Sequence, residues 1–339
     1  MSVERVIRVC HQHDDARELR LALLDELRAA VGYDAYSWLL TDPETEVGCA
    51  PLADVPCLPE LPRLIRLKYL TPVNRWTRLE APVALLGARR DHSLVWREML
   101  AGYGVDDVAS AVFRDRFGCW AFLELWRIGR DRPFTDADAA FLTAIAEPVT
   151  AALRRCQART FDTVPSPPDR AGPVVLMLSP ELEVRAQTPE TDRYLRALVP
   201  PDTERRPVPS GAYNVAAQLL AVEAGVDDHP PWARVHLPGG AWLTLRAARI
   251  GDAPADIAVT IETASPAERT DVFARALGLS AREAELLGHL VAGADTHHVA
   301  EAMFLSEHTV QDHLKSIFAK SGTRNRRSLI ARAAGSARP

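Results

Sequence analysis

The stretch that most constrains how this chain can fold lies near its C-terminus, at residues 306–322 (SEHTVQDHLKSIFAKSG). Ser306 can cap a helix, because its hydroxyl accepts a hydrogen bond from an otherwise unpaired backbone N–H. Gly322 is a natural helix terminator. An apolar stripe recurs at helical spacing between them and consists of Val310, Leu314 and Ile317. The sequence therefore predicts an amphipathic helix whose opposite face is polar.

Capping signals predict three more short helices around this one. Ser280 and Glu283 form a capping box, in which each residue satisfies a backbone N–H near the other. A second helix is expected over residues 296–303, and Asn325 can cap a fourth helix. A three-residue turn separates the second helix from the third. This spacing is typical of a helix-turn-helix.

The segment from Leu279 to Ala333 resembles the LuxR/GerE-type DNA-binding domain over its whole length of about 60 residues. The matching positions are Ser280, Arg282, Glu283, Leu287, Leu290, Gly293, Val299, Ala300, Ser306, Thr309, Val310, His313, Ile317, Lys320, Arg324, Asn325 and Arg326. The chain departs from the family pattern at residues 295–298 (DTHH) and at Gln311, where many members carry Asn-Lys and Lys. Both departures remove positive charge, so we expect weaker phosphate affinity or a partial dependence on histidine protonation.

The resemblance implies that residues 306–321 form the recognition helix, which enters the major groove of double-stranded DNA. The side chains then expected to contact base edges are Gln311, Asp312 and Lys315. The side chains expected to contact phosphates are Ser306, His308, Thr309, Lys320, Arg324 and Arg326. An alternative for Asp312 is a simple ion pair with Lys315, one helical turn away.

The resemblance also implies partners. Members of the family bind DNA as dimers through the last helix, which here would be residues 326–334, so a homodimer is expected. The helix predicted from Asp136 to Arg159 is a second candidate dimer element, and RNA polymerase is a further candidate partner. The charge distribution agrees with a DNA partner at the C-terminal end. Residues 268–339 hold 10 Lys and Arg against 8 Asp and Glu, whereas the whole chain has a net charge of −5.

A chain of 339 residues is too long for one ordinary domain, and its composition is that of a globular protein. No run of about 18 uncharged apolar residues and no signal peptide is present, so the expected location is cytoplasmic, without a membrane partner. The five cysteines are scattered and form no CxxC pair, and we expect buried or unreactive thiols. The predicted fold class is α+β and multidomain, with two sheet-containing domains before an all-α four-helix domain at 268–339.

Residues 1–160 alternate helices with strand-like runs. Two strands, 108–114 and 119–128, are predicted to be joined by a tight turn, and a helix follows from Asp136. This order resembles a GAF domain, a fold that usually holds a small molecule against its sheet. The side chains that could line such a pocket are Trp38, Trp76, Trp96, Trp120 and Trp126. The alternative is that these aromatic side chains are plain core.

A proline-rich linker is predicted at 161–172, since three prolines and a glycine occur within it. Residues 173–264 then read as two strands, two helices and a three-strand meander, an order that resembles a PAS domain. Such folds can hold haem or flavin, but His236 alone is expected to be structural. The sequence predicts no cofactor and leaves the identity of a small-molecule effector open.

The motifs of enzymes are missing from the sequence. It contains no GxGxxG or GxxxxGK[ST] phosphate loop and no recognisable nucleophile–histidine–carboxylate pattern, so the expected protein is not an enzyme. No metal site is predicted, because His297 and His298 have no third ligand nearby. The predicted function is therefore that of a transcription regulator whose sensor-like domains control a helix-turn-helix. In the alternative, these domains bind no ligand and serve dimerisation or protein interaction.

Overall fold

The computed structural model describes residues 2–129, 132–162, 174–198, 209–237, 240–251 and 254–335. The chain divides into two compact units. The first, called the sheet unit here, comprises Met1–Leu153, Asp169–Val235 and Leu243–Glu262. The second, called the helical unit, comprises Arg154–Pro168, His236–Trp242 and Thr263–Pro339. Of the linker predicted at 161–172, only its first two residues belong to the described part of the chain.

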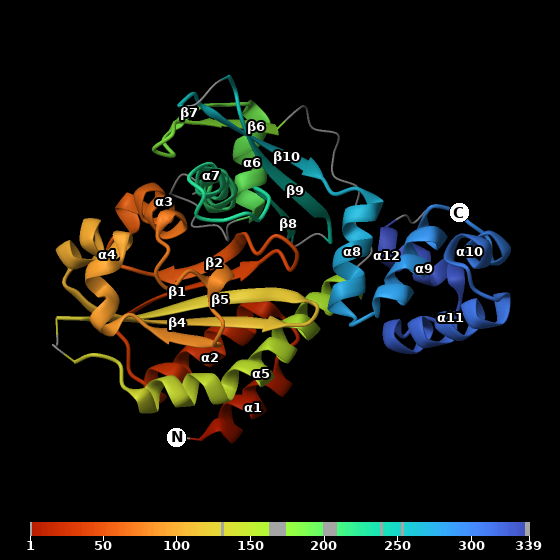
Figure 1. The fold of residues 1–339 in the computed structure, drawn as a ribbon, viewed down its shortest axis with the longest axis horizontal. Coiled ribbons are helices and arrows are strands. Elements are labelled where there is room, and N and C mark those ends of the chain that lie inside the picture. The colour runs from red at the N-terminus through yellow and green to blue at the C-terminus, as the bar shows by residue number, and fades with distance from the viewer. Residues whose placement is uncertain are drawn as a thin grey trace. The chain divides into compact units, whose positions relative to one another are not determined.

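The first half of the sheet unit is built on a five-stranded antiparallel sheet in the order β2-β1-β5-β4-β3. Its strands are β1 (Ala35–Thr41), β2 (Gly48–Asp54), β3 (Val83–Leu85), β4 (Val105–Asp115) and β5 (Gly118–Ile128). The helices on one side of this sheet are α1 (Val3–Gln12), α2 (Ala16–Ala30) and α5 (Asp136–Arg159). Two others, α3 (Leu61–Leu70) and α4 (Leu94–Glu98), lie toward the opposite side (Figure 1).

The predicted pair of strands at β4 and β5 is confirmed, and both strands are longer than expected. Gly118 begins β5 with a φ of 149°, and a Cβ there would lie 2.2 Å from the carbonyl oxygen of Pro43. Only glycine fits this close approach. Strand β2 was not predicted because its segment contains Pro51, but β2 is an edge strand, where proline is tolerated.

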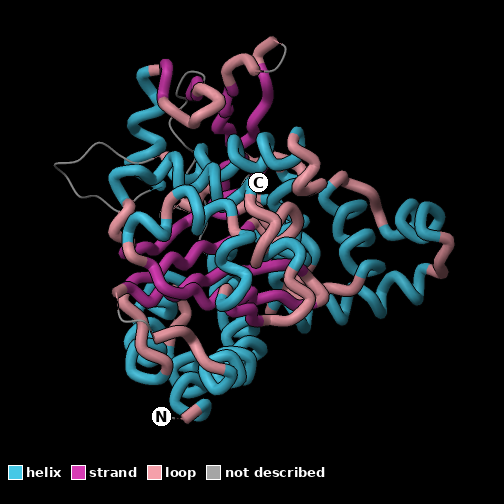
Figure 2. Tube along the Cα trace, turned by 60° about the vertical axis from the view of Figure 1, so that its left-hand side comes forward, coloured by secondary structure: helices cyan, strands magenta, loops and turns pink. Residues whose placement is uncertain are grey.

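A second five-stranded antiparallel sheet has the order β7-β6-β10-β9-β8, the same arrangement as the first. Its strands are β6 (Val174–Leu178), β7 (Val184–Gln187), β8 (Trp232–His236), β9 (Trp242–Arg249) and β10 (Ile257–Thr263). Two helices, α6 (Pro189–Leu198) and α7 (Ser210–Glu223), lie beside this sheet, as the labels in Figure 1 show; Figure 2 shows the helices in cyan and the strands in magenta from another side. Helix α7 is apolar on nearly all sides and packs against α3 and β2 of the first sheet.

The helical unit contains five helices in its described C-terminal part. They are α8 (Pro266–Ala276), α9 (Ala281–Val291), α10 (Thr296–Met303), α11 (Glu307–Ser321) and α12 (Arg326–Ala334). The last four match the predicted helices. The first was missed, although Ser265 and Glu268 form a capping box with proline at the first helical position. Phe161, from the short helix η5 (Thr160–Asp162), stacks on Trp242 and packs edge-on against Phe273 of α8.

All five cysteines are buried, as predicted. Burial raises the pKa of the Cys49 and Cys119 thiols to about 12, which keeps them protonated at neutral pH. No helix within the described ranges is both long and apolar enough to cross a membrane.

Candidate functional site

Helix α11 is held at both ends by the residues that the sequence predicts. The Ser306 hydroxyl accepts a hydrogen bond of 3.1 Å from the backbone N–H of Thr309. Gly322 ends the helix in the left-handed conformation, with a φ of 64°. Val310, Leu314 and Ile317 are buried in the helical unit, which leaves the opposite face of α11 open to solvent.

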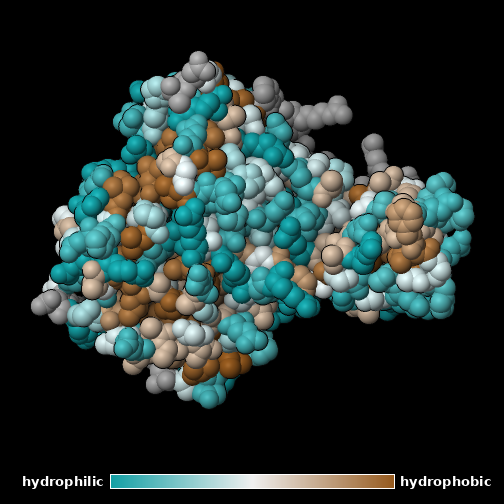
Figure 3. All heavy atoms as spheres, viewed as in Figure 1, coloured by the Kyte–Doolittle hydropathy of each residue, from teal (hydrophilic) through white to brown (hydrophobic). Residues whose placement is uncertain are grey.

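The open face carries the three side chains predicted to read bases, and all three are exposed. Lys315 donates a hydrogen bond of 2.9 Å to Asp312. The ion pair predicted as the alternative role of Asp312 is therefore present in the structure. His308 lies 3.6 Å from the other oxygen of the same carboxylate. The hydrogen bond from Lys315 lowers the pKa of Asp312. The surface over α11 is mainly hydrophilic (Figure 3). The opposite charges of Lys315 and Asp312 offset each other on this face.

The predicted phosphate contacts fall into two groups. Ser306, His308 and Arg324 are exposed, and Thr309 is half-buried beside the Ser306 hydroxyl, 2.9 Å away. The remaining two already have partners within the helical unit. Lys320 bonds Glu283, and the guanidinium of Arg326 donates to the carbonyl oxygen of Ala294 in the turn after α9.

Glu283 links the start of α9 to α11. The predicted capping box is confirmed, with Ser280 N–H donating to Glu283 Oε2 at 2.6 Å. The same carboxylate accepts hydrogen bonds from Ser316 at 2.5 Å and Lys320 at 2.6 Å. Burial acts to raise the pKa of Glu283, but the bonds from Lys320, Ser316 and Ser280 outweigh it and lower the pKa to about 2. No sequence signal pointed to the contacts with α11, because more than 30 residues separate the partners.

A cavity of about 250 Å³ lies between the first sheet and α3. Its apolar lining comes mainly from α3 and from strands β1, β2 and β5. Two residues of α7 also contribute. The first sheet with its helices is called the first sheet domain below, and the second sheet with α6 and α7 is called the second sheet domain. The lining consists of Ser37, Leu39, Thr41, Gly48, Pro51, Ala53, Val55, Leu58, Leu61, Leu64, Ile65, Lys68, Tyr69, Trp76, Phe122, Glu124, Trp126, Ser210 and Asn214. Most of these positions carried no sequence signal.

Two of the five tryptophans predicted to line a pocket, Trp76 and Trp126, line this cavity. The other three lie elsewhere. Trp38 follows the cavity-facing Ser37 on β1 by one residue, so it points to the opposite face of the sheet and stacks on Phe113. Trp96 of α4 and Trp120 of β5 are not among the lining residues either; their indole N–H groups donate to Val105 and Asp115, respectively.

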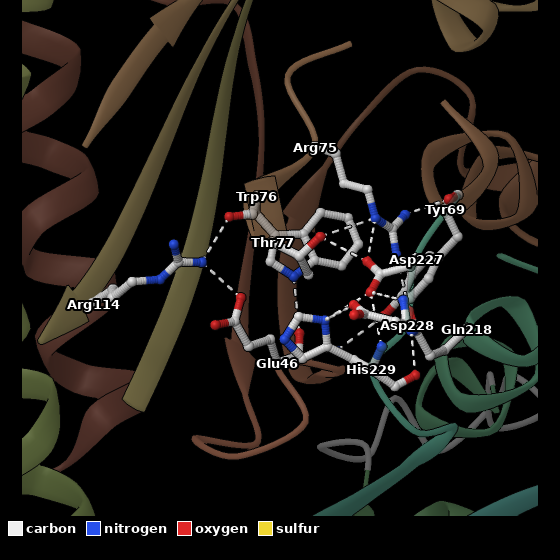
Figure 4. A network of polar contacts seen from close by, with 11 residues as sticks. Glu46, Tyr69, Arg75, Trp76, Thr77, Arg114, Gln218, Asp227, Asp228 and His229 are labelled. Atoms are coloured by element: carbon white, nitrogen blue, oxygen red, sulfur yellow. Dashed lines mark hydrogen bonds and ion pairs between the residues drawn. The ribbon is translucent and has the colours of Figure 1, made fainter. Parts of the chain in front are cut away.

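A buried polar network joins the two sheet domains beside this cavity (Figure 4). The Arg75 guanidinium, which is 0% exposed, donates to Asp227 at 2.5 Å and to Gln218 of α7 at 2.9 Å. Thr77 donates to the same carboxylate at 2.7 Å, and the His229 backbone N–H donates to its other oxygen at 2.9 Å. Burial acts to raise the pKa of Asp227, but the bonds from His229, Thr77 and Arg75 lower it. The Asp227 carboxylate is therefore ionised, and both of its oxygens accept hydrogen bonds.

A second buried ion pair ties the domains together at β8. The guanidinium of Arg234 donates to both oxygens of Asp42, at 2.8 and 2.9 Å, and both side chains are at most 1% exposed. Thr45 in the same turn donates to the carbonyl oxygen of Trp232 at 2.6 Å. Together with the network at Arg75, these bonds fix the second sheet domain, and hence α7, on the first.

Among the described residues, one group could present three metal-ligating side chains to a single ion, namely Asp227, Asp228 and His229. The first of these already accepts bonds from Arg75, Thr77 and His229. The His229 ring lies 2.7 Å from the Asp227 carboxylate, and this bond raises its pKa. We therefore interpret the group as part of the interdomain network.

Comparison with known proteins identifies the C-terminal helices. Residues 277–333 match the family of bacterial regulatory proteins described as the luxR family. This range runs from the end of α8 through α12 and lies inside the predicted range 268–339. These residues are a LuxR-family helix-turn-helix domain, which indicates a DNA-binding transcription regulator.

No protein with a curated description matches the chain. Among solved structures, Escherichia coli SdiA aligns with 98% of this chain and 95% of its own chain, at 12% sequence identity and a TM-score of 0.39. At that TM-score, the alignment carries no weight for fold or function.

Proposed function

We propose that the protein is a sequence-specific transcription regulator in which the sheet unit controls the DNA affinity of the helix-turn-helix. In this proposal α11 lies in the major groove, where Gln311, Asp312 and Lys315 contact base edges. The side chains proposed to contact phosphates are Ser306, His308, Thr309, Lys320, Arg324 and Arg326. The DNA-binding species is a homodimer, since the exposed face of one α11 offers little net positive charge. RNA polymerase is a further proposed partner.

One observation carries the proposal. Residues 277–333 match the luxR family, and within them α11 buries its apolar stripe and exposes its polar face. We further propose that the two sheet domains are GAF-like and PAS-like sensors. Support comes from their shared strand order and from the apolar cavity on the first sheet. The proposed role is regulatory rather than enzymatic.

The test is selection of bound sequences from random double-stranded DNA by the full-length protein. We expect an enriched motif with two related half-sites, because a symmetric dimer presents α11 twice. A single unrepeated motif would contradict the dimer, and no enrichment above random sequence would contradict sequence-specific binding. Sedimentation of the protein with the selected DNA then gives the number of chains per site.

A further inference from the structure

The cavity on the first sheet contains a buried side chain whose hydrogen-bonding groups are unused. Asn214 of α7 is 1% exposed, and neither its amide nitrogen nor its amide oxygen has a partner among the residues that the structure describes. The indole nitrogen of Trp126, which lines the same cavity, is also buried without a partner. Buried amides are nearly always paired in native proteins, so Asn214 points to a molecule that supplies both a donor and an acceptor.

Polar groups gather around Gly48 at one part of the lining. A Cβ at this residue would lie 3.3 Å from the Tyr69 hydroxyl and 3.5 Å from Cγ of Asn214. The backbone N–H of Gly48 already donates to that hydroxyl at 3.0 Å. Tyr69, Trp76 and Phe122 form a continuous aromatic group, with successive ring centroids 4.9 and 5.0 Å apart. The Asn214 amide therefore lies beside flat apolar surfaces that suit a planar polar head.

The paired charges of the cavity lining favour a neutral ligand. Lys68 and Glu124 are the one basic and the one acidic residue among the described residues of the lining, and they form an ion pair with each other. Ser110 also donates to Glu124, at 3.3 Å. A ligand with a net charge would enter an apolar site without a free counter-ion, which is unfavourable. The volume of about 250 Å³ is more than ten times the roughly 15 Å³ that one water needs, so the cavity has room for an organic molecule.

We propose that this cavity binds a neutral small molecule with an apolar body and an amide or lactam head, and that the head pairs with Asn214 of α7. The proposal deepens the sensor role proposed above and names the class of effector. Ser210 and Asn214 belong to the second sheet domain, so the site is complete only when α7 is seated on the first. The ion pairs Arg75–Asp227 and Asp42–Arg234 hold it there. The effector thus contacts both sheet domains at once.

The test titrates full-length protein with octanamide and with octanoate, which share a hydrocarbon chain but differ in the charge of the head. Isothermal titration calorimetry should give saturable one-to-one binding of octanamide and at least tenfold weaker binding of octanoate. Equal or tighter binding of octanoate, or saturable binding of neither probe, would overturn the proposal. The titration contains no DNA, so its failure leaves the DNA-binding proposal standing.

The decisive variant is Asn214→Leu, which keeps the size of the side chain and removes the amide. We expect octanamide affinity to fall at least tenfold, while the thermal midpoint of the free protein stays equal or rises, because an unpaired buried amide is lost. A merely structural Asn214 would lower the midpoint and leave the affinity of the folded protein unchanged. If this variant does not fold, Leu61→Trp fills the cavity from α3 and should abolish octanamide binding.

Thr244→Val is the matched control. Thr244 of β9 is also buried with an unpartnered hydroxyl, but it is not part of the cavity lining. Its replacement should leave octanamide affinity unchanged. A tenfold loss in this control would show that binding responds to any change in the buried polar groups, and the assignment to Asn214 would fall.

Discussion

The ammonium group of Lys320 donates a hydrogen bond of 2.6 Å to the carboxylate of Glu283, across two helices of the DNA-binding domain. Lys320 lies near the end of α11, and Glu283 caps the start of α9. The lysine that we propose contacts a DNA phosphate thus also holds α11 against α9. If Lys320 contacts a phosphate as proposed, one side chain links the placement of α11 to phosphate affinity.

Glu283→Gln should destabilise the helical unit by about 2 kcal/mol, because it weakens charge-assisted bonds to Ser316 and Lys320 at a buried position. Chemical denaturation followed by circular dichroism measures this loss. Glu285→Gln is the control, since Glu285 is exposed and pairs with Arg282 on the same helix; it should cost less than about 1 kcal/mol. Equal losses would contradict a special role for Glu283.

The same pair predicts a pH dependence. The folded pKa of Glu283, about 2, lies below the ordinary 4.5. The stabilisation by this carboxylate is therefore complete above about pH 4.5 and is lost as the pH falls towards 2. The stability difference between wild type and Glu283→Gln should shrink across that window. A difference that stays constant between pH 5 and pH 2.5 would contradict the assignment.

Asp312→Asn should strengthen DNA binding on the order of threefold to tenfold at low salt, because it releases Lys315 and removes a negative charge from the side of α11 that we propose faces DNA. Fluorescence anisotropy with the selected DNA and with an unrelated duplex measures both affinities. If Asp312 reads a base, the preference for the selected sequence falls at the same time. Asp271→Asn on α8, which removes the same charge from another helix, should have a smaller effect.

Lys315→Ala should weaken DNA binding, and the salt dependence shows how. If Lys315 contacts a phosphate, the slope of log K against log salt becomes shallower by about 0.9 per chain bound. If it contacts a base, the slope changes little and the selected sequence changes at one position in each half-site. Unchanged affinity, slope and sequence preference would exclude both roles.

Phe304→Gly should stabilise the helical unit by about 1 kcal/mol. Phe304 ends α10 in the left-handed conformation, with a φ of 57°, and is 95% exposed, so it strains the backbone without packing in return. Thermal unfolding of the full-length protein measures the gain. Ala302→Gly is the opposite control, because Ala302 lies exposed within α10, where glycine should cost about 1 kcal/mol.

Asp227→Asn should destabilise the sheet unit by about 3 to 5 kcal/mol, because the buried Arg75 guanidinium loses its counter-charge. The neighbouring Asp228 has a side chain that is 99% exposed, and Asp228→Asn should have almost no effect. Urea unfolding of both variants makes the comparison. Similar midpoints for the two would show that the ion pair does not hold the domains together.

Local signals in the sequence were enough for the helices of the DNA-binding domain. Hydroxyl and amide caps at Ser280, Ser306 and Asn325, with Gly322 as terminator, place helix ends through contacts between residues three or four apart. The strands of the second sheet were predicted in the same way, from short apolar runs between turns. Predictions of this kind succeed because capping and periodicity act within one or two turns of the chain.

The cavity on the first sheet shows which features local sequence signals do not predict. A tryptophan in a strand is conspicuous in the sequence, but whether it faces a cavity depends on strand phase. Trp38 is out of phase with Ser37 and packs on the other face, whereas Trp126 pairs with Ala35 and lines the cavity. Asn214 carried no signal, because an asparagine in an apolar helix acquires a role only when that helix lies over another domain.

The sequence by itself determined the four helices of the helix-turn-helix domain, the polar face of α11 and the strands β4 to β10, since all of these depend on neighbours along the chain. Only the tertiary structure decided that Glu283 holds α11 and that α7 completes the cavity. Only the tertiary structure also decided that Arg75 and Arg234 join the two sheet domains. The partners in those contacts are tens to almost two hundred residues apart, and no spacing rule in a sequence reaches across such distances.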